Sequence, residues 1–221
     1  MFALDLFSNI KYMIKVNVSI LILTILALTG CASGYTTIQP KFVKYVSYSN
    51  NNNVELEYKY DVLQNKYAKR EFKKDVKLIA VRITNNSDKE LMFGRDILIT
   101  YENGKEAVIM DYLQVFRNLR QRPALYLFYL LLTPLNIFAT NSSGKTTTIP
   151  IGLVVGPGVS GGNIIGASVA NKNFKNELIE NDIIGDIVKP GETIYGLIGL
   201  KLTSYEALKI KVDVTDGSIQ Y

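Results

Sequence analysis

The sequence predicts a mainly β protein, in which an antiparallel β-sandwich is interrupted by a hydrophobic, glycine-rich helical hairpin. Alternating apolar and polar residues separated by turn-forming residues occupy 54–110 and return in 187–221. Between them, residues 111–186 lose this alternation and contain two long apolar stretches around a polar loop. Because the strand pattern resumes afterwards, we interpret 111–186 as an insertion into one β-domain.

The chain opens with a segment that is typical of a secretory leader. Lys15 precedes an almost wholly apolar run over 16–28, and small residues around Gly30 end that run. This order of basic residue, short apolar run and small residues predicts a signal peptide over 1–30. Met13 begins a more compact leader, so a start at Met13 is an alternative. An uncleaved anchor competes with this interpretation, but the run is short for a membrane span.

The only cysteine of the chain ends the leader, in the sequence Leu28-Thr29-Gly30-Cys31. This tetrapeptide resembles the lipobox of bacterial lipoproteins. The resemblance implies that diacylglycerol is added to the thiol of Cys31, that the leader is cut before this residue, and that the new amine is acylated. Several chains matter because one acyl chain binds a membrane weakly. Ala32 follows in place of Asp, which by resemblance to Gram-negative sorting implies an outer-membrane lipoprotein of the cell envelope that faces the periplasm. Exposure at the cell surface stays open.

A polar segment follows the cysteine. Residues 31–53 are rich in Ser, Thr, Gly, Tyr and Asn, and we expect them to form a tether. Inside it, 42–46 is a candidate edge strand. The asparagine run Asn50-Asn51-Asn52-Asn53 is expected to be a turn or loop.

The strands of the first β-segment are predicted from alternation. Apolar residues at every second position, which we expect to face a core, are Val54, Leu56, Tyr58 and Tyr60 in one strand and Ile79, Val81 and Ile83 in another. The basic stretch 66–77 between them is either a short helix or a solvated loop.

A hairpin is predicted at Asn103-Gly104, a pair that favours a two-residue type I′ turn. This register places Glu102 opposite Lys105. The residues expected on the core face of the hairpin are Ile97, Ile99, Tyr101, Val108 and Met110.

The last segment repeats this pattern. A turn is predicted at 189–192, a strand over 193–202 in which Gly196 and Gly199 mark a bulge or close packing, and a strand over 208–214. Ile83-Thr84-Asn85-Asn86-Ser87 and Lys189-Pro190-Gly191-Glu192-Thr193 resemble segments of immunoglobulin-like domains of secreted bacterial proteins. The resemblance implies an immunoglobulin-like sandwich and no activity.

Helices are predicted inside the insertion. Tyr112, Val115, Phe116 and Leu119 have helical spacing, and Pro123 can begin a second helix that continues to Ala139. A polar loop over 140–148 separates it from the apolar stretch 149–170. Residues 171–184 have the pattern of an amphipathic helix.

Small residues recur every four positions in the second apolar stretch, at Gly158, Gly162, Gly166 and Ala170, with Gly152 and Gly156 before them. Such spacing forms a helix face that another backbone can approach closely. It resembles the glycine-zipper segments of some envelope lipoproteins, which implies that these four residues pack a helix. Pro157 departs from the pattern and is expected to cap or kink the helix.

Three placements of the hairpin are open: it enters or contacts a membrane, packs on the β-domain, or forms an oligomer interface. Its first helix would be about 24 Å long, shorter than the ~30 Å hydrocarbon core of a bilayer. Arginines before it, and Lys172 and Lys175 after it, suit lipid headgroups.

The sequence motifs give little support for a catalytic function. Gly158-Val159-Ser160-Gly161-Gly162 fits the G-x-S-x-G pattern, but the chain has no histidine to act as the base. Residues 139–146 match a phosphate-binding loop loosely, without a good helix start after them. Asp182 and Asp186 are too few ligands to indicate calcium. We therefore predict no catalytic residue, metal or cofactor, and no nucleic-acid partner.

These patterns favour a lipid-anchored, non-enzymatic envelope protein with a structural or binding role at the periplasmic face of the membrane. Its expected partners are membrane lipid, through acylated Cys31 and alternatively through 124–170, and a second copy or another envelope protein. The alternative is an oligomeric assembly, secretion or pore component built through the Gly158-Gly162-Gly166 helix. An exported enzyme of unknown type is the third interpretation.

Overall fold

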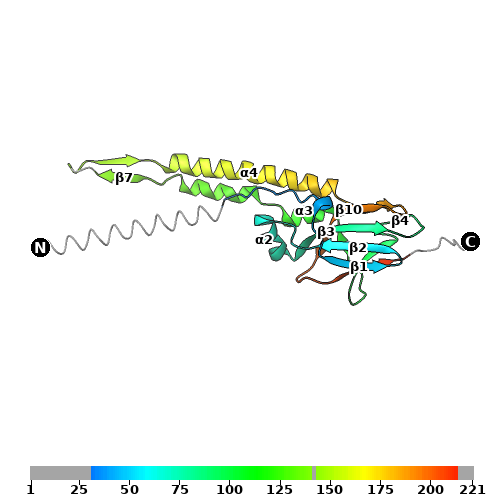
Figure 1. Ribbon diagram of the computed structural model, residues 1–221. Coiled ribbons are helices and arrows are strands. Elements are labelled where there is room, and N and C mark those ends of the chain that lie inside the picture. Colours follow the sequence, from blue (N-terminus) through cyan, green and yellow to red (C-terminus); the bar gives the residue numbers. More distant parts are fainter. Residues whose placement is uncertain (1–30, 141–142, 214–221) are drawn as a thin grey trace, which may run out of the picture. The chain divides into compact units, whose positions relative to one another are not determined.

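The computed structural model describes residues 31–140 and 143–213 of the 221-residue chain. The lipobox residues before Cys31 and the leader, with its two candidate start sites, lie outside these ranges. The chain forms two compact units, Met1–Ala32 and Ser33–Tyr221. The second unit contains every helix and strand of the described residues (Figure 1).

In the described residues, the second unit combines antiparallel strands with three α-helices and two 3₁₀ helices. In chain order the elements are η1 (Pro40–Phe42), β1 (Ser47–Asn51), β2 (Val54–Lys59), α2 (Asn65–Lys74), β3 (Val76–Asn85), β4 (Leu91–Met92), β5 (Ile97–Tyr101), β6 (Ile109–Met110), α3 (Tyr112–Leu119), η2 (Pro123–Leu132), β7 (Ile137–Thr140), β8 (Thr146–Ile149), α4 (Gly152–Glu180), β9 (Ile187–Val188), β10 (Thr193–Lys201) and β11 (Leu208–Val212). The expectation of mainly β structure with a helical insertion agrees with the fold at this coarse level.

Every ladder between these strands is antiparallel. A five-stranded sheet has the order β1-β2-β3-β10-β6, and the pairs β11-β5, β4-β9 and β7-β8 form smaller sheets. The longest ladder joins β3 to β10, from Thr193 opposite Thr84 to Lys201 opposite Val76. The first and last β-segments of the sequence thus form one sheet, with the helical insertion between them in the chain.

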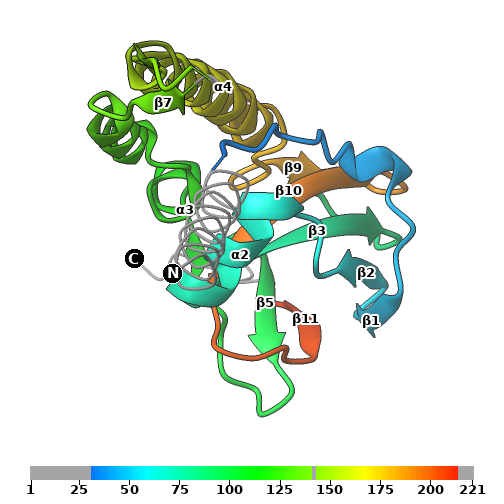
Figure 2. The same cartoon turned by 90° about the vertical axis from the view of Figure 1, so that its left-hand side faces the viewer.

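The five-stranded sheet is covered on both faces. One face packs on the helices, where Tyr67 of α2, Val115 of α3 and Phe174 of α4 lie against the sheet residues Leu78 and Leu197. The other face packs on β4, β5, β9 and β11. Figure 2 shows α2 and α3 on the helical side of β3. The core on the strand side includes Leu56, Ile79, Val81, Ile83, Phe93, Ile99, Ile198 and Ile210. Because both faces are covered, nearly all of β3 is buried.

The residues predicted to face a core in β2 and β3 are confirmed, but in β3 the residues between them, such as Leu78 and Ala80, are buried on the opposite face. Val54, Leu56 and Tyr58 are buried in the core between the sheets, and Tyr60 packs against it. The basic stretch after β2, for which the sequence allows a helix or a loop, forms α2. Its buried residues are Tyr67 and Glu71, so this helix presents a narrow inner face to the sheet.

The hairpin prediction at Asn103-Gly104 is wrong in its turn type and register. Gly104 has a φ of 79°, but Asn103 does not have a positive φ, which a type I′ turn requires. The N–H of Tyr101 donates to Lys105 O at 2.8 Å, so the loop has three residues and Glu102 does not face Lys105. Val108 is 81% exposed and leaves the core face predicted for it. Met110 also differs, because it packs in the core on the helical side of the sheet.

A turn of the predicted type lies instead in the asparagine run. Asn51 pairs with Val54, and the two residues between them, Asn52 and Asn53, have φ values of 48° and 61°. Both values are positive, as a type I′ turn requires, and asparagine tolerates a positive φ better than most residues. The run therefore closes the β1-β2 hairpin. The edge strand predicted over 42–46 is wrong in position, because η1 ends at Phe42 and β1 begins at Ser47.

The predicted turn and strand at the end of the chain are confirmed, including close packing at the glycines of β10. A Cβ on Gly196 would lie 2.6 Å from Cγ2 of Ile183, and one on Gly199 would clash with Val115. The chain after α4 and helix α3 therefore approach the strand closely where no side chain intervenes.

The insertion differs from the prediction in its helices. Residues after Pro123 form the 3₁₀ helix η2 only as far as Leu132, and β7 and β8 form a short hairpin where the sequence predicts a helix end and a polar loop. The second apolar stretch and the amphipathic segment after it are one continuous helix, α4, with Pro157 inside it. Pro157 neither starts the helix nor ends it.

Candidate functional site

Residues 123–170, which we call the arm, form the most apolar exposed part of the second unit. Figure 1 shows η2 and α4 side by side, joined through the β7-β8 hairpin. The large apolar side chains of the arm that are exposed are Leu125, Leu127, Phe128, Leu130, Leu131, Leu135, Ile137, Phe138, Ile149, Leu153, Val154, Ile165 and Val169. Soluble monomers rarely expose so many large apolar side chains in one region.

Helix α4 has the length and composition of a membrane span. In the described residues it is the one helix that is long and apolar enough to cross a bilayer, and its most apolar window is only 22% buried. A core helix of a soluble protein would be mostly buried. About 20 residues, from Gly152 to Asn171, give a rise of about 30 Å, which is close to the hydrocarbon thickness of a bilayer.

The arm is held together by small residues on one side of α4. The buried residues of its apolar part are Gly152, Gly156, Ser160, Asn163, Ala167 and Ala170. A Cβ on Gly156 would lie 2.7 Å from Oγ1 of Thr133, and one on Gly152 would clash with the backbone of Leu132. These two glycines therefore let η2 and the turn after it approach the helix closely.

The predicted packing residues divide between two faces of α4. Ala170 is buried beside Phe174, whereas Gly158, Gly162 and Gly166 are exposed. A Cβ on Gly158 or Gly162 would meet nothing within 4 Å in the described residues. Packing of Gly158, Gly162 and Gly166 against a helix of another molecule therefore stays a prediction. The face that packs inside the chain repeats at intervals of four, four, three, four and three residues from Gly152. The sequence analysis includes Gly152 and Gly156 among the small residues but misses their continuation through Ser160, Asn163 and Ala167.

A buried amide pair closes the base of the arm. The N–H of Gln121 donates to Oδ1 of Asn171 at 2.8 Å, and Nδ2 of Asn171 donates to Gln121 O at 2.9 Å. The hydroxyl of Tyr67 donates to the same Oδ1 at 3.1 Å. Because these polar groups are buried and satisfied by one another, they fix α4 against the end of α3.

The first residues of the predicted tether are packed along this base. The N–H of Ser33 donates to Oε1 of Gln121 at 3.2 Å, and Nε2 of Gln121 donates to Ser33 O at 2.7 Å. Farther on, the N–H groups of Ile38 and Gln39 donate to Oε1 of Glu177 at 2.7 and 3.1 Å. Residues 33–39 therefore form a strap on α4, and the expectation of a tether over 31–53 does not hold for them.

Tyr35 anchors the strap. Its hydroxyl donates to Oε2 of Glu177, and its ring packs on Tyr67 and Phe174 with centroid distances of 5.2 Å to each. Burial, and then the neighbouring carboxylate of Glu177, raise the pKa of Tyr35 far above its usual value. The residue therefore stays a neutral hydrogen-bond donor.

Cys31 is exposed, and only Ala32 separates it from the strap. Consecutive Cα atoms are 3.8 Å apart, so covalent geometry keeps the Cα of Cys31 within about 8 Å of that of Ser33. Acylation of its thiol stays a prediction.

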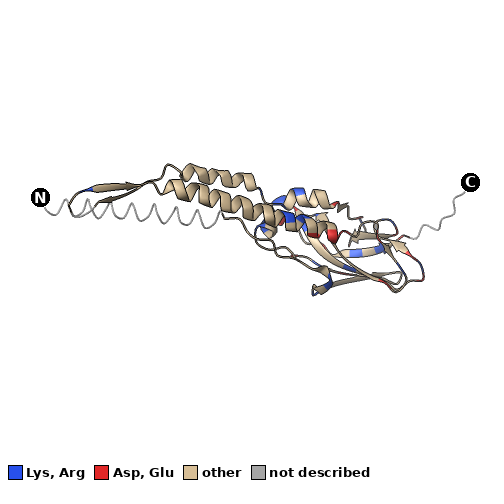
Figure 3. Ribbon diagram, turned by 90° about the horizontal axis from the view of Figure 1, so that it is seen from above, with Lys and Arg blue, Asp and Glu red and all other residues tan. Residues whose placement is uncertain are grey.

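The arm has charge only near its two ends (Figure 3). From 112 to 176 the sequence has no acidic residue, and its basic residues are Arg117, Arg120, Arg122, Lys145, Lys172 and Lys175. Lys145 follows the turn of the β7-β8 hairpin, and the others flank the amide pair at the base. The apolar length between these ends contains no formal charge.

The motifs considered for chemistry do not assemble a reactive site. Ser160 of the G-x-S-x-G match is 3% exposed on the inner face of α4, so a substrate cannot reach its hydroxyl. The loose phosphate-loop match runs into β8, whereas a phosphate loop leads directly into a helix. In the part of the chain that the structure describes, no group of three or more Asp, Glu, Cys or His residues could hold a metal.

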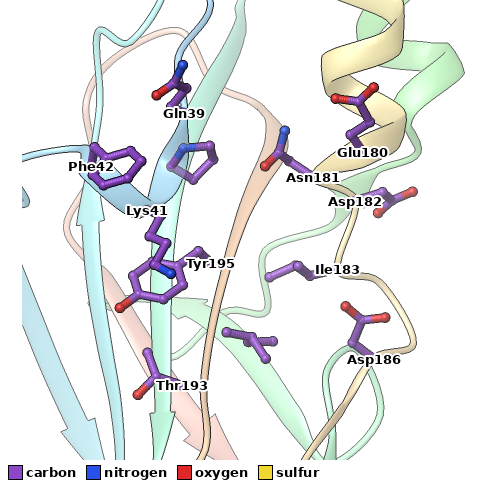
Figure 4. A pocket seen from close by; sticks show the side chains of 12 residues that line it. Gln39, Lys41, Phe42, Glu180, Asn181, Asp182, Ile183, Asp186, Thr193 and Tyr195 are labelled. Carbon is purple, nitrogen blue, oxygen red and sulfur yellow. The ribbon is translucent and has the colours of Figure 1, made fainter.

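An open pocket of about 410 Å³ lies between η1, the start of β10 and the chain after α4. Lys41 and Tyr195 line one wall, and Glu180, Asp182 and Asp186 line the other (Figure 4). The carboxylate of Asp182 accepts the N–H of Ile184 at 3.1 Å, which gives it a local role in the turn. The pocket does not bring a nucleophile next to a base.

Comparison with known proteins gives no independent indication of function: no protein-family model, no curated protein and no solved structure matches the chain.

Proposed function

We propose that this protein is a lipid-anchored protein of the bacterial cell envelope whose arm enters the membrane that holds acylated Cys31. The observation that carries the proposal is the arm, which has an uncharged, exposed apolar surface along a helix of bilayer length. Water would make such a surface an aggregation hazard, whereas a bilayer would cover it. The role is structural or binding, and no catalysis is assigned.

The ends of the arm suit this placement. Its basic residues lie where lipid headgroups would be, at the base and near Lys145. The β7-β8 hairpin has unpaired outer edges, which are costly in hydrocarbon. Thr146, Thr147 and Thr148 are polar, whereas Ile137 and Phe138 are apolar and exposed. We therefore place this hairpin at the headgroup level, at the edge of the apolar core.

The strap supports a common attachment site. Because Ser33 is bonded to Gln121, the acyl chains of Cys31 would enter the lipid within a short distance of the base of the arm. The five-stranded sheet would stand at the membrane surface, with its strands outside the lipid. We retain the immunoglobulin-like sandwich as part of the proposal, with β1-β2-β3-β10 facing β5 and β11.

The chain has no tryptophan, so a single introduced tryptophan can report contact with lipid. Full-length lipidated Phe128→Trp protein is returned to vesicles whose phosphatidylcholine carries bromine in the acyl chains. Phe128 is 68% exposed on η2, so we expect bromine to quench its replacement strongly. The matched variant is Phe42→Trp, at a position 79% exposed on η1, which should keep its fluorescence.

If each variant fluoresced as strongly in brominated vesicles as in unbrominated vesicles, membrane entry of the arm would be contradicted. Burial of the arm by a protein partner would also leave Phe128→Trp unquenched, so the measurement separates lipid from protein as the cover. Palmitate labelling of the wild type and of Cys31→Ala tests the anchor separately. Labelling that persists in Cys31→Ala would contradict lipidation at this residue.

A second candidate is an oligomer assembled through the outer face of α4. Gly158 and Gly162 are exposed with open space around them, and small residues at this spacing favour helix association in membranes. Cross-linking of the wild type in vesicles should then give discrete oligomers that Gly162→Leu removes. A wild type that remains monomeric at high density would contradict this candidate and leave membrane entry intact.

A further inference from the structure

Three arginines from different elements gather at the base of the arm. Arg70 lies on α2, Arg120 is the C-cap residue that follows α3, and Arg122 immediately precedes η2. Gln121, between the last two, shares Oδ1 of Asn171 with the hydroxyl of Tyr67, which lies one helical turn before Arg70. Because Tyr67 and Gln121 both donate to Oδ1 of Asn171, the part of α2 that carries Arg70 lies near the junction of α3 and η2.

The charges and exposure of the three side chains agree with this placement. Burial lowers the pKa of Arg70, and the charges of Arg122 and Arg120 lower it further, as expected for guanidinium groups that lie close together. Arg120 and Arg122 are exposed, and Arg70 is half-buried. The guanidinium of Arg120 also lies over the ring of Phe116, 5.6 Å from its centre. Two of the three guanidinium groups are therefore accessible from outside.

Among the described residues, no carboxylate forms an ion pair with this group. In the described residues no salt bridge involves any of the three arginines. Glu71, the residue after Arg70 on α2, is turned inward and accepts the N–H of Leu78 at 2.7 Å. Like charges held together without an anion are unfavourable, and an external anion would relieve the repulsion.

Tyr126 connects the arginine group to the arm. It lies in η2, and its hydroxyl accepts a hydrogen bond from Nζ of Lys66 at 2.9 Å. The same ammonium lies 5.0 Å from the centre of the Tyr126 ring, and the ring of Tyr129 stacks on it at 6.4 Å. Tyr126 is buried, whereas Tyr129 is half-buried. A fourth cation and one partly exposed amphipathic ring thus lie where the charged base meets the apolar surface, as at a membrane interface.

We propose that Arg70, Arg120 and Arg122 together bind the phosphate of an anionic phospholipid at the base of the arm. Guanidinium groups match phosphate oxygens with paired N–H donors, and three from separate elements can surround one headgroup. The acyl chains of that lipid would lie along the exposed side of η2. This inference rests on the proposed entry of the arm into the membrane.

The test uses the full-length lipidated Phe128→Trp protein in two sets of mixed vesicles. In one set the brominated lipid is phosphatidylglycerol, in the other it is phosphatidylcholine, and unbrominated phosphatidylcholine makes up the rest. Stronger quenching by brominated phosphatidylglycerol measures its preference for the surface of η2. We expect a preference of about fivefold or more, the size given by one basic residue at a membrane surface.

Arg70→Gln, Arg120→Gln and Arg122→Gln in one chain should bring this preference close to one. The matched control removes three exposed lysines of the strands and turns, Lys105→Gln, Lys189→Gln and Lys209→Gln, and should keep it. The proposed lipid site is wrong if the triple arginine variant keeps the preference for phosphatidylglycerol. It is also wrong if the protein with all three arginines shows no such preference. Strong quenching by brominated phosphatidylcholine would still support entry of the arm, so the two proposals fail separately.

Inorganic phosphate distinguishes a lipid headgroup from free phosphate. Added at an ionic strength matched with chloride, it should reduce the preference for phosphatidylglycerol no more than chloride does. Complete loss of the preference in phosphate alone would overturn the assignment to a lipid.

Discussion

At the scale of single residues, Glu71 is the buried acid whose protonation is most sensitive to the fold. Burial raises its pKa to about 7, although the N–H of Leu78 and the charge of Lys77 act in the opposite direction. The folded state therefore binds a proton more tightly than the unfolded state does. The free energy of unfolding should fall as pH rises from about 4.5 to about 7, and change little from this cause above that range.

Glu71→Gln should remove this dependence, because the amide cannot ionise and its oxygen can still accept the N–H of Leu78. A shift of this size corresponds to at most about 3 kcal/mol between the two pH limits. Thermal unfolding in detergent, followed by circular dichroism from pH 5 to pH 8, measures it. The exposed Glu90→Gln is the control and should retain the wild-type slope. An unchanged slope in Glu71→Gln would show that another group is responsible.

At the scale of elements, the two glycine faces of α4 are expected to respond differently to substitution. Gly156→Val places a branched side chain against Thr133, where backbone and side-chain atoms are already close. We expect it to lower the free energy of unfolding by about 1–3 kcal/mol, as overpacking does elsewhere. Gly158→Val meets open space and should leave thermal unfolding in detergent unchanged. The reverse ranking of the two variants would show that the helix is rotated about its axis.

Strands of this protein are predictable from the sequence because alternation follows burial directly. Val54, Leu56 and Tyr58 are correct for this reason. The turn at Asn103-Gly104 is wrong because glycine also suits a three-residue loop with one positive φ, and only the partner strand decides between them. Strand β5 pairs with the distant β11 across the whole of Ile97–Tyr101, a contact that no local pattern contains.

The candidate site is predictable in composition but not in geometry. The apolar stretches, the flanking basic residues and the cysteine stand in the sequence, whereas the position of Arg70 beside them depends on how α2 packs. The regular spacing of the exposed glycines points to the outer face of α4. The face that packs on η2 includes the polar residues Ser160 and Asn163, which in the sequence look like a break in an apolar face. Asn163 is tolerated there because its Nδ2 donates to Val159 O at 2.7 Å within the helix.

At the scale of the whole molecule, the strap changes how the anchor and the second unit are expected to work together. A flexible tether would let the strands move away from the membrane. Residues 33–39 are instead bonded to Gln121 and Glu177, so almost no free chain remains after Cys31. If Cys31 is acylated and the arm lies in lipid, we expect the arm to fix the height of the sheet above the membrane, and the acyl chains to add affinity without setting that height.

A lengthened anchor tests this division of roles. Inserting about 12 Gly and Ser residues between Ala32 and Ser33 adds a flexible chain with an end-to-end distance of about 20 Å. If acylation alone held the protein, the strands could move outward by a comparable distance. Energy transfer from a dye on Val108→Cys, an exposed position, to an acceptor in the lipid headgroups reports this height. We expect the insertion to leave the transfer unchanged, because the arm holds the sheet in place.

The control places the same insertion in a chain that also carries Leu131→Lys and Val154→Lys. Both positions are exposed on the arm, so the substitutions should leave the fold intact while charge opposes entry into hydrocarbon. With the arm expelled and the anchor lengthened, the strands are free to move outward and the transfer should fall. Equal loss of transfer in both chains would mean that the anchor, and not the arm, holds the sheet at the membrane.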